Sequence, residues 1–132
     1  MEETLVLVKP DAFSKRYTWD IIKEYSDAGF DIIKIKIDVP SKEVCENHYI
    51  EHKDQPFFHE LVDFLSSGPL CALVLRGENV VSKVRKINGS TDPLKADCGT
   101  IRKKYGESKR RNAVHASDSV EHAQREIDIW FR

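Results

Sequence analysis

Two short runs of apolar residues constrain the fold of this chain more than any other feature. They are TLVLVK at residues 4–9 and LCALVL at residues 70–75. A continuous apolar run of this length is typical of a strand in the middle of a sheet that is buried on both faces. Both segments are therefore predicted to be buried strands.

A third strand is predicted at residues 30–39, where apolar and charged side chains alternate. Ile33, Ile35 and Ile37 point to one side, and Lys34 and Lys36 point to the other. Successive side chains of a strand face opposite sides of its sheet, so one side of this strand is expected to be wet and the isoleucine side to be buried.

Helices are predicted between these strands, over residues 18–28, 41–49, 57–65, 79–87 and 120–130. A short strand is predicted just before residue 115. The order β-α-β-(α-α)-β-α-β-α indicates an α+β fold with helices on one face of the sheet. It suits a ferredoxin-like α/β sandwich, in which a four-stranded antiparallel sheet is covered by helices.

Composition predicts a single domain over residues 1–132 and excludes some classes of partner. A net charge of −1 gives no overall attraction to nucleic acid or to an anionic membrane surface. The three cysteines, Cys45, Cys71 and Cys98, have no metal-ligand spacing, which favours a reducing compartment. No signal peptide or membrane-spanning run is found, so a cytoplasmic location is expected.

Residues 88–111 form a long polar stretch that is predicted to be a loop, and a loop of this length usually carries function. Six of its basic residues gather within residues 102–111: Arg102, Lys103, Lys104, Lys109, Arg110 and Arg111. They could bind phosphate, because guanidinium groups match phosphate oxygens bidentately, or they could form a solvated basic surface. Arg85 and Thr91 could add a guanidinium and a hydroxyl donor.

The segment NAVHASDS at residues 112–119 places His115 between a short strand and a helix start. Ser117, Asp118 and Ser119 are helix-capping residue types, and Asp118 and Glu121 have capping-box spacing. Backbone amides at a helix start favour anions, and neutral imidazole is a nucleophile near pH 7. His115 is therefore either a phosphoryl acceptor or a buried, hydrogen-bonded core histidine.

Other polar or aromatic side chains are weaker candidates when taken alone. Lys9 ends the first strand, and one residue of the Phe57–Phe58 pair could stack on a ligand while the other is buried. Glu126 could orient the His115 ring. The remaining histidines, His48, His52, His59 and His122, have no convincing metal-ligand spacing and are expected to be surface or structural residues.

Six segments together resemble the nucleoside diphosphate kinases. They are TLVLVKPDA, HYIEHKDQPFF, SGPLCALVL, NGSTDP, GTIR and NAVHASDS, in this order along the chain, and the match as a whole runs from about Thr4 to Phe131. The resemblance implies a ping-pong reaction in which His115 takes the γ-phosphate of a nucleoside triphosphate, such as ATP, and passes it to a nucleoside diphosphate. Mg²⁺ would arrive on the nucleotide phosphates, with few or no direct protein ligands.

The same resemblance implies roles for the other candidates. Lys9 and Asn112 would contact the sugar, with Lys9 also near the phosphates, and Phe57 would stack on the base. The phosphates would be held by Arg85, Thr91 and Arg102, while Tyr49, Ser117 and Glu126 would support or orient the histidine. Lys103, Lys104, Lys109 and Cys98 depart from the usual family residues without replacing any of these groups.

The resemblance also implies a homo-oligomer built from dimers, with a hexamer favoured over a tetramer. Trp130 and Phe131, close to the last residue, suggest apolar surface that a partner covers in part. Two other function classes are weighed against the kinase. A non-catalytic nucleotide-sensing module would have lost His115, Lys9 or Arg102, and a nucleic-acid-binding domain would carry basic and aromatic residues on its sheet face.

Overall fold

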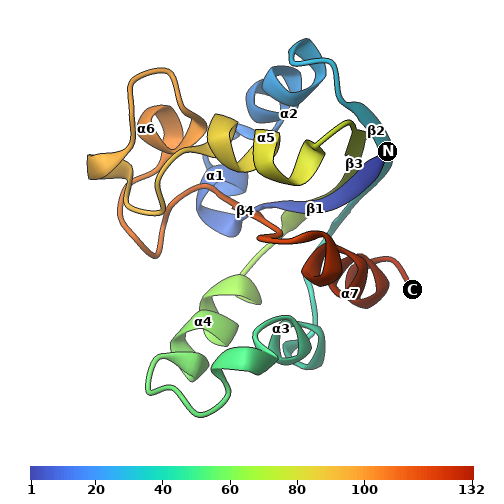
Figure 1. Cartoon of the computed structure of the whole chain (residues 1–132). Helices are drawn as coiled ribbons and strands as arrows, with labels where there is room; N and C mark the ends of the chain where they lie inside the picture. Colours follow the sequence, from blue (N-terminus) through green and yellow to red (C-terminus); the bar gives the residue numbers. More distant parts are fainter.

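The computed structural model describes residues 1–132 as a sheet of four strands with helices inserted between them (Figure 1). In chain order the elements are β1 (Glu2–Val8), α1 (Pro10–Ser14), α2 (Thr18–Asp27), β2 (Asp31–Asp38), α3 (Lys42–His48), η1 (Ile50–His52), α4 (Phe58–Leu65), β3 (Leu70–Gly77), α5 (Val80–Asn88), η2 (Pro93–Lys95), α6 (Ile101–Tyr105), β4 (Val114–Ala116) and α7 (Val120–Trp130).

The four strands lie in the order β2-β3-β1-β4, and every neighbouring pair is antiparallel. The two apolar runs are the two central strands, as predicted, with Val6 opposite Leu73. The short strand β4 pairs with β1 at one edge and places His115 opposite Leu7. The predicted α+β fold with a four-stranded antiparallel sheet is confirmed.

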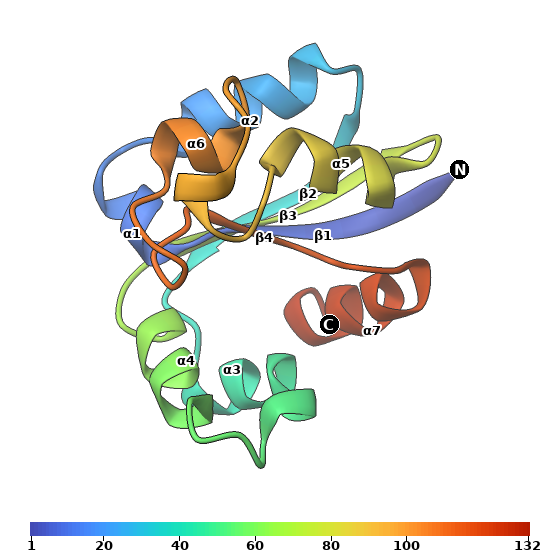
Figure 2. The ribbon, with the colours of Figure 1, turned by 60° about the vertical axis from the view of Figure 1, so that its left-hand side comes forward.

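Helices cover both faces of this sheet. Val6 and Leu73 pack with α2 and α5 in one apolar cluster, while Leu7 and Val74 pack with α4 and α7 in another, and all four are fully buried. Figure 2 shows α2, α5 and α6 on one side of the sheet and α3, α4 and α7 on the other. The prediction of helices on one face was therefore wrong. Alternate residues of β1 and β3 face opposite sides, so a continuous apolar run needs cover on both.

Edge strand β2 exposes the side that was expected to be buried. Ile35 and Ile37 have exposed fractions of 45% and 50%. Lys34 and Lys36 instead lie over the Phe131 ring, with their Nζ atoms 5.9 and 5.5 Å from its centroid. A register shift between Ile32 and Lys34 marks a bulge, and nothing in the single chain covers the isoleucines that follow it.

The segment 88–111 is not a structureless loop. It contains η2 and α6, and the Thr100 side chain caps α6 by accepting a hydrogen bond from the backbone N–H of Lys103. Ile101 is fully buried and anchors α6 against the sheet. The sequence did not predict α6, because a helix of about one turn among polar residues is too short to show an apolar periodicity.

Capping of α7 also differs from the prediction. Ser119 is the N-cap residue, and its hydroxyl accepts a hydrogen bond from the His122 N–H at 3.1 Å. Asp118 does not cap the helix, because its carboxylate contacts the His122 ring instead. None of the helices combines the length and the apolar character that crossing a membrane requires.

Candidate active site

A cavity of about 300 Å³ lies where the ends of β1 and α3 meet β4, α7 and the 88–112 segment. Most of the candidate residues line it: Lys9, Tyr49, Arg85, Thr91, Arg102, Asn112, His115 and Glu126. Ser117 is fully buried behind Glu126. Phe57 is half-buried and does not line the cavity itself, but its ring lies 5.5 Å from that of His52, which does. Phe58 is buried in the core.

His115 is held in place by a strained turn just before β4. Ala113 has a φ of +74°, and the Val114 N–H donates to the Asn112 carbonyl at 2.9 Å, which defines a γ-turn. Asp11 and Lys9 hold this turn: the Asp11 carboxylate accepts from the Ala113 N–H at 3.0 Å, and the Lys9 N–H donates to the Ala113 carbonyl at 2.9 Å. The turn lets Asn112 and His115 face the same cavity.

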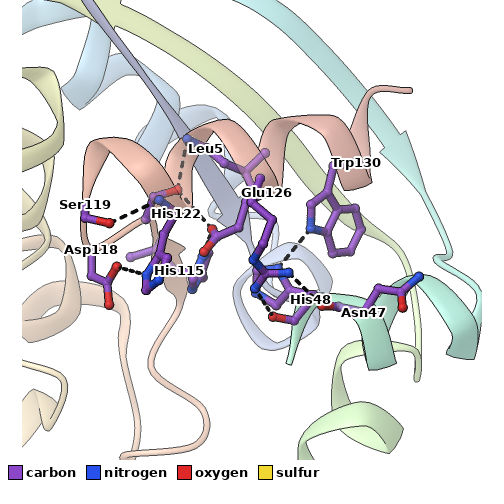
Figure 3. A network of polar contacts seen from close by, with 12 residues as sticks. Leu5, Asn47, His48, His115, Asp118, Ser119, His122, Glu126 and Trp130 are labelled. Atoms are coloured by element: carbon purple, nitrogen blue, oxygen red, sulfur yellow. Dashed lines mark hydrogen bonds and ion pairs between the residues drawn. The ribbon is translucent and has the colours of Figure 1, made fainter. Parts of the chain in front are cut away.

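One nitrogen of the His115 ring is engaged by a buried carboxylate. His115 Nε2 lies 2.7 Å from Glu126 Oε1, and the Ser117 hydroxyl donates to the same oxygen at 2.9 Å (Figure 3). A carboxylate only accepts hydrogen bonds, so Nε2 carries the proton of the neutral ring and Nδ1 keeps its lone pair. The Ser117 hydroxyl also accepts from the Leu5 N–H, at 3.4 Å, which ties the carboxylate to β1.

Buried cations surround this nucleophile. Lys9 has an exposed fraction of 6%, and its ammonium donates to Asn112 Oδ1 at 2.9 Å and to the Arg110 carbonyl at 2.8 Å. Burial lowers the pKa of this ammonium to about 8, although the Asp11 charge opposes the shift. Arg102 donates to the carbonyls of Gly89 and Val114, at 2.9 and 2.8 Å, and burial lowers its pKa.

Arg85 and Thr91 complete the polar wall of the cavity. Both side chains are exposed and form no hydrogen bond or ion pair within the chain, whereas the Thr91 carbonyl accepts a hydrogen bond from Asn112 Nδ2 at 3.1 Å. Cations and hydrogen-bond donors gathered around one imidazole are the arrangement that phosphoryl transfer requires.

Comparisons with known proteins assign this arrangement to a family. The model of the nucleoside diphosphate kinase family matches residues 2–132. The nucleoside diphosphate kinase of Acaryochloris marina is 48% identical over 132 residues, which covers 100% of this chain and 89% of that protein. The chain belongs to the nucleoside diphosphate kinase family.

Solved structures of the family agree with this assignment. The nucleoside diphosphate kinase of Aquifex aeolicus superposes with a TM-score of 0.96 at 42% identity, covering 99% of this chain and 95% of that one. A nucleoside diphosphate kinase family protein of Babesia bovis gives a TM-score of 0.97 at 40% identity, covering 99% and 88%. The fold of this chain is therefore the nucleoside diphosphate kinase fold.

Sequence reasoning missed His48, which is buried beside His115. The two ring centroids are 4.4 Å apart at an interplanar angle of 79°. Burial lowers the pKa of His48 well below its usual value, and the charges of His115 and Arg125 act in the same direction. The one signal in the sequence was its spacing from Cys45, because positions three apart share a face of α3 and both residues are buried.

A second histidine, His122, was expected to be a surface or structural residue, and it lies in the wall of the cavity. Its ring contacts two carboxylates, Asp118 at 2.5 Å and Glu51 at 3.0 Å. The hydrogen bond with Asp118 raises the pKa of the imidazole. This group links η1 to the start of α7 across the wall of the cavity.

The γ-turn gives a test of how Asp11 supports the site. Asp11→Ala removes the acceptor of the buried Ala113 N–H and should lower the free energy of unfolding by about 1–3 kcal/mol, measured by urea denaturation. Asp11→Asn keeps an acceptor and should restore part of that loss. Asp128→Ala, an exposed carboxylate on α7, is the control and should change stability by less than about 0.5 kcal/mol. Equal stability of Asp11→Ala and the control would contradict this role.

Proposed function

We propose that this chain transfers the γ-phosphoryl group of a nucleoside triphosphate to a nucleoside diphosphate through a phosphohistidine at His115. The observation that carries the proposal is the hydrogen bond between His115 Nε2 and Glu126. It leaves Nδ1 of His115 with a lone pair in a cavity lined by cations. Membership of the nucleoside diphosphate kinase family supports the same reaction.

The reaction has two balanced steps. His115 Nδ1 attacks the γ-phosphorus, an N–P bond forms, the bond from the γ-phosphorus to the bridging oxygen breaks, and a nucleoside diphosphate leaves. A terminal oxygen of a second diphosphate then attacks, the N–P bond breaks and the neutral ring is restored. The proton on Nε2 stays on the hydrogen bond to Glu126 throughout, so the enzyme needs no separate general base.

The surrounding residues would hold the nucleotide and the charge that moves. Lys9, Arg85, Arg102 and Thr91 would bind the phosphates, where fixed donors stabilise charge spread over the phosphoryl oxygens. Asn112, held by Lys9, would contact the sugar together with it. The half-buried Phe57 ring would stack on the base, which tolerates every base because each has a π face.

We propose Mg²⁺ as the cofactor, carried by the nucleotide phosphates. Mg²⁺ prefers oxygen ligands in an octahedral geometry and commonly takes them from substrate phosphates and water. The one group of three potential metal-binding side chains in the chain is His48, His115 and Glu126, which contains two imidazoles and does not suit Mg²⁺. When bound, the ion would neutralise phosphate charge as the phosphoryl group moves.

We also propose that the chain forms a homodimer through β2. The outer edge of β2 pairs with no strand, and the apolar side chains of Trp19 and Ile37 line a hollow of about 240 Å³ beside it. Trp19 has an exposed fraction of 63%. A second copy related by a two-fold axis would pair edge to edge and cover this patch, because such an interface is self-complementary. Dimers of this kind could assemble further into a hexamer or a tetramer.

Two broader proposals concern the whole chain. Residues 1–132 would fold as one domain, because both apolar clusters pack on the same sheet. The three cysteines are all free, which fits a reducing compartment such as the cytoplasm.

The phosphoryl acceptor can be tested directly. His115→Ala should abolish labelling by γ-labelled ATP and reduce nucleotide exchange to background, because it removes Nδ1, the nitrogen that attacks the γ-phosphorus. The label on the wild-type protein should be labile to acid and stable to base. His59→Ala, an exposed histidine away from the cavity, is the matched control and should keep both. Full exchange by purified His115→Ala would disprove the mechanism.

The pKa of Lys9 predicts a pH dependence of nucleotide binding. The ammonium is charged below a pKa of about 8 and neutral above it. The dissociation constant for ADP should therefore rise as the pH increases from 7 to 9, by up to about tenfold if only the charged form binds. In Lys9→Arg the guanidinium stays charged, so the rise should be much smaller. Titration calorimetry measures both, and identical pH profiles would exclude this role of Lys9.

Assembly through β2 can be tested by placing a charge in the patch. Wild-type protein at micromolar concentration should sediment without substantial monomer, whereas Ile37→Glu should shift the population toward monomer because a buried unpaired charge is costly. Leu94→Glu, at a leucine with an exposed fraction of 80%, should leave the assembly unchanged. A monomeric wild-type protein, or an Ile37→Glu variant with unchanged assembly, would refute the proposed interface.

A further inference from the structure

His48 has a position that the reaction above does not use. It is the last residue of α3, has an exposed fraction of 5% and packs edge-on against both His115 and Trp130. One potential ligand atom from each of His48, His115 and Glu126 lies within 4.8 Å of the others. The immediate neighbour of the nucleophile is therefore a second imidazole, and its protonation state matters to His115.

A single face of α7 controls both imidazoles. Glu126 contacts His115, and Trp130, one helical turn later, donates from its indole Nε1–H to His48 Nδ1 at 3.1 Å (Figure 3). Arg125 donates to the carbonyls of Asn47 and His48, at 3.0 and 3.4 Å, and so fixes the end of α3 against α7.

The direction of the bond from Trp130 decides the tautomer of His48. An indole N–H can only donate, so His48 Nδ1 must accept and carry a lone pair. A neutral ring with a bare Nδ1 has its proton on Nε2. Trp130 has an exposed fraction of 2%, so water cannot replace the acceptor, and a buried donor without a partner would cost about 1–3 kcal/mol.

This tautomer has a consequence for His115. With a proton on Nε2, His48 offers no lone pair there and cannot accept the Nε2–H of His115. The Ser117 hydroxyl donates to Glu126 and accepts from Leu5, and the His115 Nε2 is hydrogen-bonded to Glu126 rather than to this hydroxyl. Glu126 remains the acceptor for His115, and Nδ1 of His115 remains the bare nitrogen.

The same tautomer prevents metal capture. Two imidazoles and one carboxylate form a ligand set that suits Zn²⁺ and related ions. A histidine that binds a metal normally donates its other ring N–H to an acceptor. Here the partner of that other nitrogen is the donor Trp130, so His48 cannot give Nε2 to a metal while the indole bond holds.

We propose that Trp130 is a positioning residue that acts through His48, because its indole N–H holds His48 in the Nε2–H tautomer. In this tautomer His48 does not accept the Nε2–H of His115, so Glu126 remains its acceptor, and His48 does not bind a transition-metal ion beside the nucleophile. The expected effect on activity rests on the proposed function, in which His115 is the phosphoryl acceptor. The tautomers and the metal binding can be measured without any phosphoryl transfer.

The first test uses NMR of the full chain with ¹⁵N-labelled imidazoles. In the wild type, His48 should have a protonated Nε2 and a bare Nδ1, and the neutral His115 ring should show the same pattern. Trp130→Phe, which removes the N–H, should populate both tautomers of both rings and lower kcat by about tenfold or more, because a catalytic histidine in the wrong tautomer loses its function.

Two further variants separate the effect of losing the indole N–H from the effect of losing apolar packing. Replacing Trp130 by an isosteric benzothiophene amino acid keeps the ring shape and removes only the donor, and it should behave as Trp130→Phe does. Phe131→Leu reduces apolar packing at the same end of α7 without touching the bond, and it should keep wild-type tautomers and kcat. Wild-type tautomers and kcat in both Trp130 variants would overturn the proposal.

The second test is a titration with Co²⁺ in the absence of nucleotide, followed by visible absorption. The wild type should show no band of a tetrahedral complex, both Trp130 variants should gain one, and adding His48→Phe should remove it again. A band in the wild type, or none in the Trp130 variants, would overturn the proposal. If His115→Ala kept full exchange activity, the mechanism would fail instead, while the tautomer and metal results would still decide the role of Trp130.

Discussion

The pairing of β4 with β1 is the constraint on which the rest of the site depends. It places His115 opposite Leu7 in a sheet whose two central strands are buried over residues 4–8 and 70–75. The γ-turn at Ala113 precedes β4 and is held from α1 by Asp11. A catalytic side chain on a sheet strand with a fixed backbone needs little rearrangement before reaction, which is the condition for effective electrostatic stabilisation.

Burial of charge is the main cost of this arrangement. Lys9, Asp11 and Glu126 all have exposed fractions of 6% or less, and an unpaired buried charge would be strongly unfavourable. Each is paired or hydrogen-bonded: Lys9 with Asn112, Asp11 with the turn, and Glu126 with His115 and Ser117. The same burial lowers the pKa of Lys9 to about 8, so the ammonium loses its charge closer to neutral pH than an exposed lysine does.

Helix α7 contacts both parts of the site, the end of α3 with His48 and the strand β4 with His115. Residues Arg125, Glu126 and Trp130 reach α3 and β4 from adjacent positions of one helix, so the end of α3 and the nucleophile are placed by the same element. This explains why His48, distant in sequence from His115, lies against it. A change in the packing of α7 would alter both imidazoles together, whereas a change in α5 or α6 would act on Arg85 or Arg102.

The sequence by itself determined the α+β fold, the central strands and the grouping of most of the site, because apolar runs and a nearly complete family motif report on local structure. The continuous apolar runs already required cover on both sheet faces, whereas tertiary structure alone decided that the β2 isoleucines are exposed and that α6 forms within the polar segment. It also decided the place of His48 and the bond from Trp130, since these depend on α3 meeting α7 on one face of the sheet. Periodicity describes one element at a time, whereas burial and hydrogen-bond direction depend on which elements meet.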